Sequence, residues 1–307
     1  MTTPGPPAVT AVVPTHNRPE LMRLAVQSIV DQTYAGMIDI IVVFDACEPE
    51  LPDVVTGPNR TLTAVLNERV RGLAGARNTG ILQSKHAYVA FLDDDDTWLP
   101  GKLDAQMAVF AEHAEVGLVG TAMLVDDGRT THARPVPLTT VTHADLVRDR
   151  IAGLHSSSFV FRRDVLVDSV GLIDEDLPGS YGEDYDVLLT TSQCSVIRLV
   201  NEPLVSVRWS GESFFYGRWS QYAAGLTYLA DKHPELREDP AASARIGSQI
   251  GFALAAAGRR PEARGWLRPA LRTQPRNLRA WLGLLVSYRL VSPQFIARLA
   301  NRLGNGI

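Results

Sequence analysis

The sequence predicts an α/β fold with a mostly parallel sheet flanked by helices, followed by α-helical hairpins towards the C-terminus. Short runs of β-branched and other apolar residues alternate with segments whose apolar residues recur at helical spacing. The runs are continuously apolar, which is typical of parallel strands covered by helices on both faces. From residue 241 only helical periodicity remains. We therefore expect a main domain of residues 1–240 and a helical extension of residues 241–307.

The alternation is clearest in the first half of the chain. Buried strands are predicted over residues 9–13, 38–45, 61–67, 87–92 and 116–125. Helices are predicted over residues 18–32, 72–84 and 99–111. In an open α/β sheet, ligands bind beyond the carboxyl ends of the strands. Polar residues follow three of these ends and should converge on one cleft: Thr15-His16-Asn17, Asp45 and Asp93 to Asp96.

The second half of the main domain is less regular. Residues 157–177 predict a strand, a short helix and an acidic loop. A helix begins within "GEDYDVLLTTSQ", and residues 194–215 predict two strands followed by a loop. Residues 222–232 predict a further helix.

The extension has the pattern of a helical repeat. Residues 244–277 fit a 34-residue helix–turn–helix unit of tetratricopeptide type, with Gly251, Ala263 and Leu267 in register. A second unit begins near Trp281. One repeat and part of another cannot form a stable core alone, so the extension should bury a face on the main domain or on a second subunit.

The charge of the chain is unevenly distributed. Residues 241–307 contain eleven arginines, no lysine and one acid, a balance of +10, whereas residues 1–240 hold 19 basic and 33 acidic residues. The arginines can contact the acidic main domain, bind an anionic membrane surface or a second copy of the chain, or simply keep the helices solvated. Nucleic acid is not expected, because no exposed aromatic residues interleave with the arginines.

The sequence also indicates the compartment. It has two cysteines, which fits a reducing environment rather than a disulfide framework. Its first residues lack a basic signal-peptide region, and no run of about 18 apolar residues occurs. We expect a cytoplasmic protein, with peripheral attachment to the inner face of the membrane as an added hypothesis.

The stretch "FLDDDDTW" brings four carboxylates to the end of a buried strand. One or two aspartates there could cap the helix that follows. Four repel one another, and a divalent cation would offset that cost. Mg²⁺ and Mn²⁺ prefer oxygen ligands and bind phosphate substrates through one or two carboxylates. Asp93 and Asp95 should point to the same side of an extended segment, which suits a metal–diphosphate site.

Taken together, the ordered motifs resemble those of a family-2 glycosyltransferase with the GT-A fold. They are "VVPTHNRPELMRLAVQSIVDQTY", "IIVVFDA", "GLAGARNTGI", "YVAFLDDDDTWLPGKL" and "GEDYDVLL", and they cover about residues 8–210. The resemblance implies a nucleotide-binding half over about residues 8–120 and an acceptor half over about residues 121–240. It implies a nucleotide-diphosphate sugar as donor, with UDP-sugars expected first and TDP- or GDP-sugars as alternatives.

The resemblance also implies site residues. Asp95 of the Asp-x-Asp element is expected to hold Mn²⁺ or Mg²⁺ directly, with Asp93 near the metal or the ribose. The residues expected to bind the nucleotide-sugar are Pro14, Thr15, His16, Asn17, Asp45, Arg71, Arg77, Asn78, Asp93, Asp94 and Trp98, with Asp96 in support. Two departures concern base recognition: His16 stands where the family often has Tyr, and "FDAC" stands for "DDGS".

The remaining motif supplies the chemistry. Inverting transfer needs one general base that takes the proton of the attacking hydroxyl. By resemblance Asp184 is that base and Glu183 assists it, although both could simply charge a helix N-terminus. His155, Arg208 and Trp209 are weaker candidates for the acceptor side. The loop from Ser210, where many relatives carry a His, could form a lid or an acceptor wall.

Two other functions compete with the transferase. A nucleotidyltransferase would need a Gly-rich, Lys- or Arg-bearing loop after the first strand, and "PTHNRPE" does not supply one. A non-catalytic binding scaffold would not need both Asp95 and Asp184. The expected function is therefore transfer of a sugar to a hydroxyl on a saccharide, a lipid-linked saccharide, a natural product or a protein.

Overall fold

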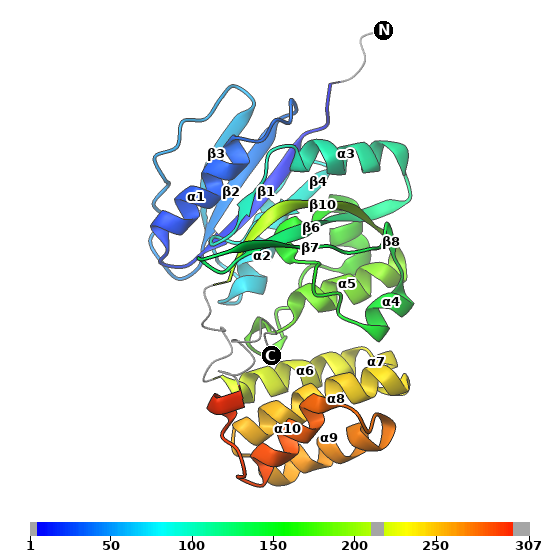
Figure 1. The fold of residues 1–307 in the computed structure, drawn as a ribbon. Coiled ribbons are helices and arrows are strands. Elements are labelled where there is room, and N and C mark those ends of the chain that lie inside the picture. Colours follow the sequence, from blue (N-terminus) through cyan, green and yellow to red (C-terminus); the bar gives the residue numbers. More distant parts are fainter. Residues whose placement is uncertain (1–4, 210–217, 297–307) are drawn as a thin grey trace. The chain divides into compact units, whose positions relative to one another are not determined.

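The computed structural model describes residues 5–209 and 218–296 (Figure 1). The chain forms two compact units. The sheet unit comprises residues 1–146, 151–175 and 183–209, and the helical unit comprises residues 147–150, 176–182 and 210–307. The predicted boundary after residue 240 falls inside the helical unit.

The sheet unit is built on one mixed sheet. The strands along it are β3 (Arg60–Leu66), β2 (Ile38–Phe44), β1 (Val9–Thr15), β4 (Tyr88–Phe91), β9 (Val160–Arg162), β6 (Val116–Asp126), β10 (Val196–Arg208) and β5 (Thr97–Trp98). At its margins β7 (Thr131–Arg134) pairs with β6, and β8 (Thr140–Val141) pairs with β10. The run from β3 to β4 is parallel, as is β6 with β10, while β9 is antiparallel to both of its neighbours. The predicted mixed, mostly parallel sheet is confirmed.

Helices cover both faces of the sheet, as the continuous apolar runs predict. The helices are α1 (Pro19–Val30), α2 (Leu73–Gln83), α3 (Lys102–Glu112), α4 (His143–Arg148) and α5 (Glu183–Cys194), with short η1 (Ser156–Ser158) and η2 (Val165–Val170). Successive strand residues point to opposite faces. Val13 therefore joins the core cluster that also holds Ile29 of α1 and Phe110 of α3, while Val12 faces Gly80 of α2.

One predicted pair of strands is a single strand. Residues 196–208 form β10, with irregular pairing to β6 between Val200 and Val205. The polar sequence Asn201-Glu202-Pro203 predicts a turn there, and Pro203 cannot donate a ladder hydrogen bond. The prediction of two strands was wrong because the sheet absorbs this segment as a local shift of register rather than ending the strand.

The helical unit contains α6 (Trp219–Lys232), α7 (Glu235–Glu238), α8 (Pro240–Ala256), α9 (Arg260–Thr273) and α10 (Leu278–Ser287), with η3 (Pro178–Ser180). The predicted hairpin is α8 and α9, which approach closely at Gly251: a β-carbon there would lie 2.6 Å from Leu267. The tetratricopeptide assignment stays a prediction. Within residues 5–209 and 218–296, no helix combines the length and apolar character needed to cross a membrane.

Candidate active site

The carboxyl ends of β1, β2 and β4 bring the predicted polar residues together. Thr15 is paired with Phe44 in the parallel register, and Leu92 after β4 donates to the carbonyl of Val12. The Thr15 hydroxyl donates to Asp94 at 2.8 Å, and the Asp45 N–H donates to the Thr15 carbonyl at 2.9 Å. The expected convergence of three strand ends on one edge of the sheet is therefore confirmed.

The four aspartates form a turn. The N–H of Asp96 donates to the carbonyl of Asp93 at 3.1 Å, and the chain resumes as a strand only at Thr97. The expectation that Asp93 and Asp95 lie on one side of an extended segment was wrong. The turn divides the carboxylates into two groups: Asp94 and Asp95 share Arg18, while oxygens of Asp93 and Asp96 lie within 4.8 Å of each other.

Each carboxylate has its own environment. Asp94 accepts from Thr15 and, at 3.1 Å, from Arg18; the same guanidinium donates to Asp95 at 2.9 Å. The Asp95 side chain is 36% exposed, which makes it the most accessible carboxylate in the site's ion pairs. Asp96 is buried and accepts from the Ser157 hydroxyl at 2.6 Å and from the N–H of Arg208 at 3.0 Å.

Arg77 is the central cation of the site. Its side chain is 1% exposed and lies on α2, with the guanidinium 5.5 Å from the centre of the Phe91 ring. It donates to Glu183 at 2.8 Å, to Asp93, and to the Ser156 hydroxyl at 2.9 Å. The guanidinium was expected to meet ribose or diphosphate. In this structure it bridges the aspartate turn to the start of α5, and the contact with ribose or diphosphate stays a prediction.

Two further residues of the predicted donor site, Asp45 and Asn78, stabilise loops through hydrogen bonds. Both oxygens of Asp45 accept hydrogen bonds, from Asn67 at 2.7 Å and from the N–H of Gly72 at 3.0 Å, which fixes the entry to α2. Asn78 is buried and exchanges two hydrogen bonds with the backbone of Ile173, as expected for a residue that pins a loop. Arg71 is exposed just before α2.

His16 and Asn17 lie in the turn after β1, and Pro14 lies within that strand. The His16 ring approaches the Asp45 carbonyl at 2.5 Å through Nδ1, and the Asn17 amide at 3.2 Å through Nε2. Asn17 has a left-handed backbone, with φ 53°. Pro14 pairs with Val43 and is buried.

Glu183 and Asp184 occupy the first turn of α5, where the helix dipole favours negative charge. Both are buried, and the turn enters from Gly182, whose φ is 92°. Asp184 accepts from the N–H of Tyr185 at 2.8 Å. Glu183 is anchored to Arg77, so the pair predicted to carry the chemistry is linked to Asp93 through a single guanidinium.

Burial and charge act in opposite directions on these acids. Burial raises the pKa of Glu183 to about 7, although Arg77 opposes the rise. Burial raises the pKa of Asp96 to about 6 against the effect of His155, and it raises the pKa of Asp94 and Asp95. The pKa of Asp93 is lowered, because the charges of Arg77 and His155 outweigh its burial.

The donor set fits a divalent cation. Ligand atoms of Asp93, Asp96 and His155 lie within 4.8 Å of one another. Five carboxylates, Asp93 to Asp96 and Glu183, surround two guanidinium groups, those of Arg18 and Arg77. Repulsion between these carboxylates adds to the effect of burial in raising their pKa values, and a cation would relieve that repulsion. Asp95 is paired with Arg18 and stays the predicted direct ligand.

His155 and Trp98 lie close to Ser157, beside the aspartate turn. His155 caps η1 and lies 3.3 Å from Asp96, so it belongs with the carboxylates, whereas it was expected on the acceptor side. Trp98 is buried, donates through Nε1 to the Ser157 carbonyl at 2.8 Å and lies 4.0 Å beneath the Lys102 ammonium. Its burial favours packing against Lys102 at the start of α3 over a direct contact with the donor sugar.

The acceptor-side residues at the end of β10 are only partly described. Arg208 is exposed and contacts the site through its backbone N–H, and the Trp209 ring is 5.0 Å from the Arg134 guanidinium. Ser210 and the proposed lid loop up to residue 217 lie outside the described residues.

Three site residues were missed by the sequence reasoning. Arg18 pairs with two aspartates, and Ser156 and Ser157 accept from or donate to the same cluster. For Ser156 and Ser157, the only feature of the sequence that could have indicated a site is the run of three serines after His155, which an apolar strand follows directly. Short polar residues beside a strand predict a turn equally well, so the pattern alone does not identify a site.

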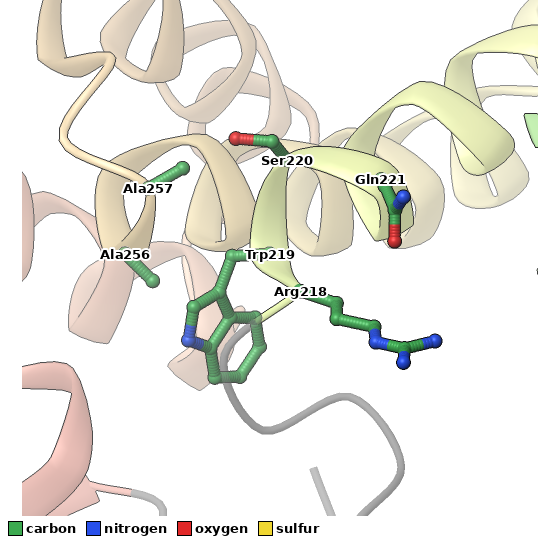
Figure 2. Close-up of a pocket in the computed structure, with 6 residues that line it drawn as sticks. All are labelled: Arg218, Trp219, Ser220, Gln221, Ala256 and Ala257. Carbon is green, nitrogen blue, oxygen red and sulfur yellow. The ribbon is translucent and has the colours of Figure 1, made fainter. Parts of the chain in front are cut away.

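The helical unit has a pocket of its own, of about 680 Å³. It is lined by Arg218, Trp219, Ser220, Gln221, Ala256 and Ala257 (Figure 2). The Trp219 ring also packs edge-on against Phe252, with ring centres 5.8 Å apart. None of the six lining residues is a carboxylate, a histidine or a cysteine, so the pocket does not supply the predicted chemistry.

Comparison with known proteins identifies the family. The family model described as glycosyl transferase family 2 matches residues 10–169, just over half of the chain. The chain belongs to glycosyl transferase family 2. This match includes the aspartate turn, Arg77 and His155, and it ends before α5.

Curated relatives agree with the family. An uncharacterized glycosyltransferase of Haemophilus influenzae is 28% identical over 199 residues, covering 63% of this chain and 65% of that protein. The Escherichia coli protein WfgD, named as a UDP-Glc:alpha-D-GlcNAc-diphosphoundecaprenol beta-1,3-glucosyltransferase, is 28% identical over 105 residues, covering 34% and 42%. The family-2 chain thus spans less than two thirds of the length of these relatives.

Solved structures show the GT-A fold. Staphylococcus aureus TarS 1–349 in complex with UDP-GlcNAc aligns with a TM-score of 0.58 at 16% identity, covering 97% of this chain and 92% of that one. The mannosyltransferase PcManGT from Pyrobaculum calidifontis, in complex with GDP-Man and Mn²⁺, aligns with a TM-score of 0.57 at 20% identity, covering 98% and 86%. The predicted GT-A architecture is confirmed.

Proposed function

We propose that this family-2 protein is a metal-dependent, inverting glycosyltransferase that moves a sugar from a nucleotide-diphosphate donor to a hydroxyl acceptor. One observation carries the proposal: Arg77 joins Asp93 of the aspartate turn to Glu183 of the Glu-Asp pair. The guanidinium thereby fixes the proposed donor site relative to the Glu-Asp pair, which contains the proposed base Asp184. Such positioning is a large part of what an enzyme must supply for a displacement.

The donor is proposed to lie at the carboxyl ends of β1, β2 and β4. Asp95, Asp93 and Asp96 with His155 are the residues available to hold Mn²⁺ or Mg²⁺. When bound, the cation supplies Lewis-acid stabilisation of the leaving diphosphate. Asp45, His16 and the exposed Arg71 are proposed to face the nucleotide, with a UDP-sugar as the first expected donor. UDP-GlcNAc and GDP-Man in the two aligned structures support this donor class.

Asp184 is proposed as the general base. The acceptor oxygen forms a bond to the anomeric carbon as the bond to the diphosphate oxygen breaks, and the hydroxyl proton passes to the Asp184 carboxylate. One displacement inverts the anomeric configuration. Arg77 keeps Glu183 oriented beside this base, and its charge opposes the rise in the pKa of Glu183.

Among the acceptor classes, a lipid-linked saccharide is favoured. Two Escherichia coli relatives, WfgD and WfaP, are named for action on a diphosphoundecaprenol-linked sugar. They match only about a third of this chain, so their names support the acceptor class and not a particular sugar.

A donor screen tests the proposal. The full chain is heated with UDP-, TDP- and GDP-sugars in the presence of Mn²⁺, and one donor should raise the melting temperature well above the rest. The same donor should then release its nucleotide diphosphate when a diphospholipid-linked sugar is added. Removal of the metal with EDTA should abolish both effects. Absence of binding and release with every donor would contradict the proposal.

A further inference from the structure

The helical unit exposes an apolar face on α10. Twelve large hydrophobic residues are exposed in the described chain, and six of them fall within residues 278–295. Four of the six recur at intervals of three and four residues along α10 and its C-cap, which places them on one side of the helix. This aromatic stripe consists of Leu278, Trp281, Leu285 and Tyr288, which are 36–70% exposed.

The stripe is not a core face left partly covered. The opposite side of α10 is already buried: Ala280, Gly283 and Val286 face inward, and a β-carbon on Gly283 would lie 2.7 Å from Leu267. A helix that is apolar on both its buried and its exposed sides has a second surface to cover.

A row of arginines lies beside the stripe. Arginines recur every four residues along α9 and therefore share one side of that helix. This arginine stripe consists of Arg260, Arg264, Arg268 and Arg272. It adjoins the aromatic stripe at Tyr288, whose hydroxyl accepts from Arg268 at 3.2 Å and whose ring lies 5.1 Å from the Arg264 guanidinium.

The arginine stripe lacks counter-charges. In residues 241–307 the only acid is Glu262, and it is paired with Arg259. Among the described residues, none of the four arginines of the stripe forms an ion pair. Like charges at intervals of four residues disfavour a helix, so the arrangement calls for an anionic surface that runs along α9.

We propose that this face of the helical unit docks on an anionic phospholipid surface, with the aromatic stripe entering the headgroup region and the arginine stripe binding lipid phosphates. Helices that combine an exposed Trp-, Tyr- and Leu-bearing face with adjacent basic residues bind membranes in this way. A symmetric pairing of two copies is less suitable, because the same face of a second copy offers no unpaired acid to the arginine stripe. The inference goes beyond the proposed transfer reaction and does not depend on it.

Vesicle sedimentation with the full chain tests the proposal. The protein should sediment with vesicles of phosphatidylcholine containing about one third phosphatidylglycerol, and not with phosphatidylcholine alone. Raising the salt from about 50 to about 500 mM should release it. The double variant Arg268→Gln/Arg272→Gln should bind about 25-fold more weakly, or about fivefold for each charge lost. Trp281→Ser/Leu285→Ser should bind at least about tenfold more weakly at about 50 mM salt.

A charge-matched control separates this face from overall charge. Arg23→Gln/Arg129→Gln removes two arginines from the sheet unit, the partly exposed Arg23 and the exposed Arg129, and should leave vesicle binding within about twofold of the wild type. Circular dichroism melts should show that every variant folds. Equal weakening by both arginine pairs, or no binding to anionic vesicles, would overturn the proposal. So would a dimer, seen by light scattering, that Trp281→Ser/Leu285→Ser dissociates without any vesicle binding.

Discussion

Arg77 sets the electrostatics of the site at the scale of a single residue. Its guanidinium is buried and paired on two sides. Burial raises the pKa of Glu183 to about 7 despite this guanidinium, whereas the same guanidinium keeps the pKa of Asp93 lowered. Asp93 and Glu183 therefore share one cation but have pKa values shifted in opposite directions. Differences of this kind often mark catalytic groups. Here they support Asp93 as an anionic ligand beside the proposed base.

Asp184→Asn should remove the base and leave the donor site intact. The amide cannot accept the acceptor proton, so we expect kcat for transfer to fall by about 10²- to 10⁴-fold. The donor dissociation constant, measured by calorimetry with Mn²⁺, should stay within about threefold of the wild type, because the residues proposed to hold the nucleotide are unchanged. A loss of kcat smaller than about tenfold would show that another group takes the proton.

Glu183 should make the protein less stable as the pH rises. Folding raises its pKa from 4.5 to about 7, so the folded chain binds more protons at this group than the unfolded chain does. The contribution of Glu183 to the free energy of unfolding should therefore fall between about pH 4.5 and 7. In metal-free buffer, urea unfolding should show this decline in the wild type and a flatter profile for Glu183→Gln. The exposed Glu68→Gln is the matched control, and an identical profile for both variants would contradict the assignment.

At the scale of elements, the strands and their ends could be predicted because burial on both faces leaves a continuous apolar run. The ends of β1, β2 and β4 were identified from such runs, and parallel register then required Thr15, Asp45 and Asp93 to meet. The path of residues 93–96 could not be predicted. Four identical side chains carry no periodicity, so nothing local distinguishes a turn from an extended segment.

The partners of the aspartates were also beyond sequence reasoning. Arg18 lies 77 residues from Asp95, and Ser157 lies 61 residues from Asp96. Each contact depends on how β1, β4 and the segment before β9 are placed beside one another, which only the three-dimensional fold specifies. His155 was assigned to the acceptor side for the same reason: its place beside Asp96 follows from the antiparallel pairing of β9 with β4.

The α8–α9 crossing provides a prediction on stability. A β-carbon at Gly251 would lie 2.6 Å from Leu267 and 3.1 Å from the Ala263 carbonyl, whereas one at Gly265 on α9 would meet nothing within 4 Å. Gly251→Ala should lower the free energy of unfolding by about 1–3 kcal/mol through overpacking. Gly265→Ala should raise it by about 0.5–1 kcal/mol through helix propensity. Urea denaturation of both variants tests this, and equal effects would show that the helices do not approach closely at Gly251.

At the scale of the whole molecule, charge and chemistry divide between the two units. The carboxylates, Arg77 and the Glu-Asp pair belong to the sheet unit, and the arginine stripe belongs to the helical unit. An acidic body is consistent with a site that binds a cation, and a basic helical unit with one that binds an anionic surface. The proposed sugar transfer and the proposed membrane binding therefore depend on different units of the chain.

This division predicts that different ligands will protect different units from hydrogen exchange. With Mn²⁺ and a nucleotide diphosphate at about 100 times the dissociation constant, amides of α2, residues 93–96 and the start of α5 should exchange up to about 100-fold more slowly. Amides of α9 and α10 should be unchanged. Anionic vesicles should protect α9 and α10 and leave the aspartate turn unaffected, as measured by mass spectrometry of peptides. Protection of both units by either ligand alone would mean that the units are energetically coupled, because a ligand stabilises only those regions whose opening its binding opposes.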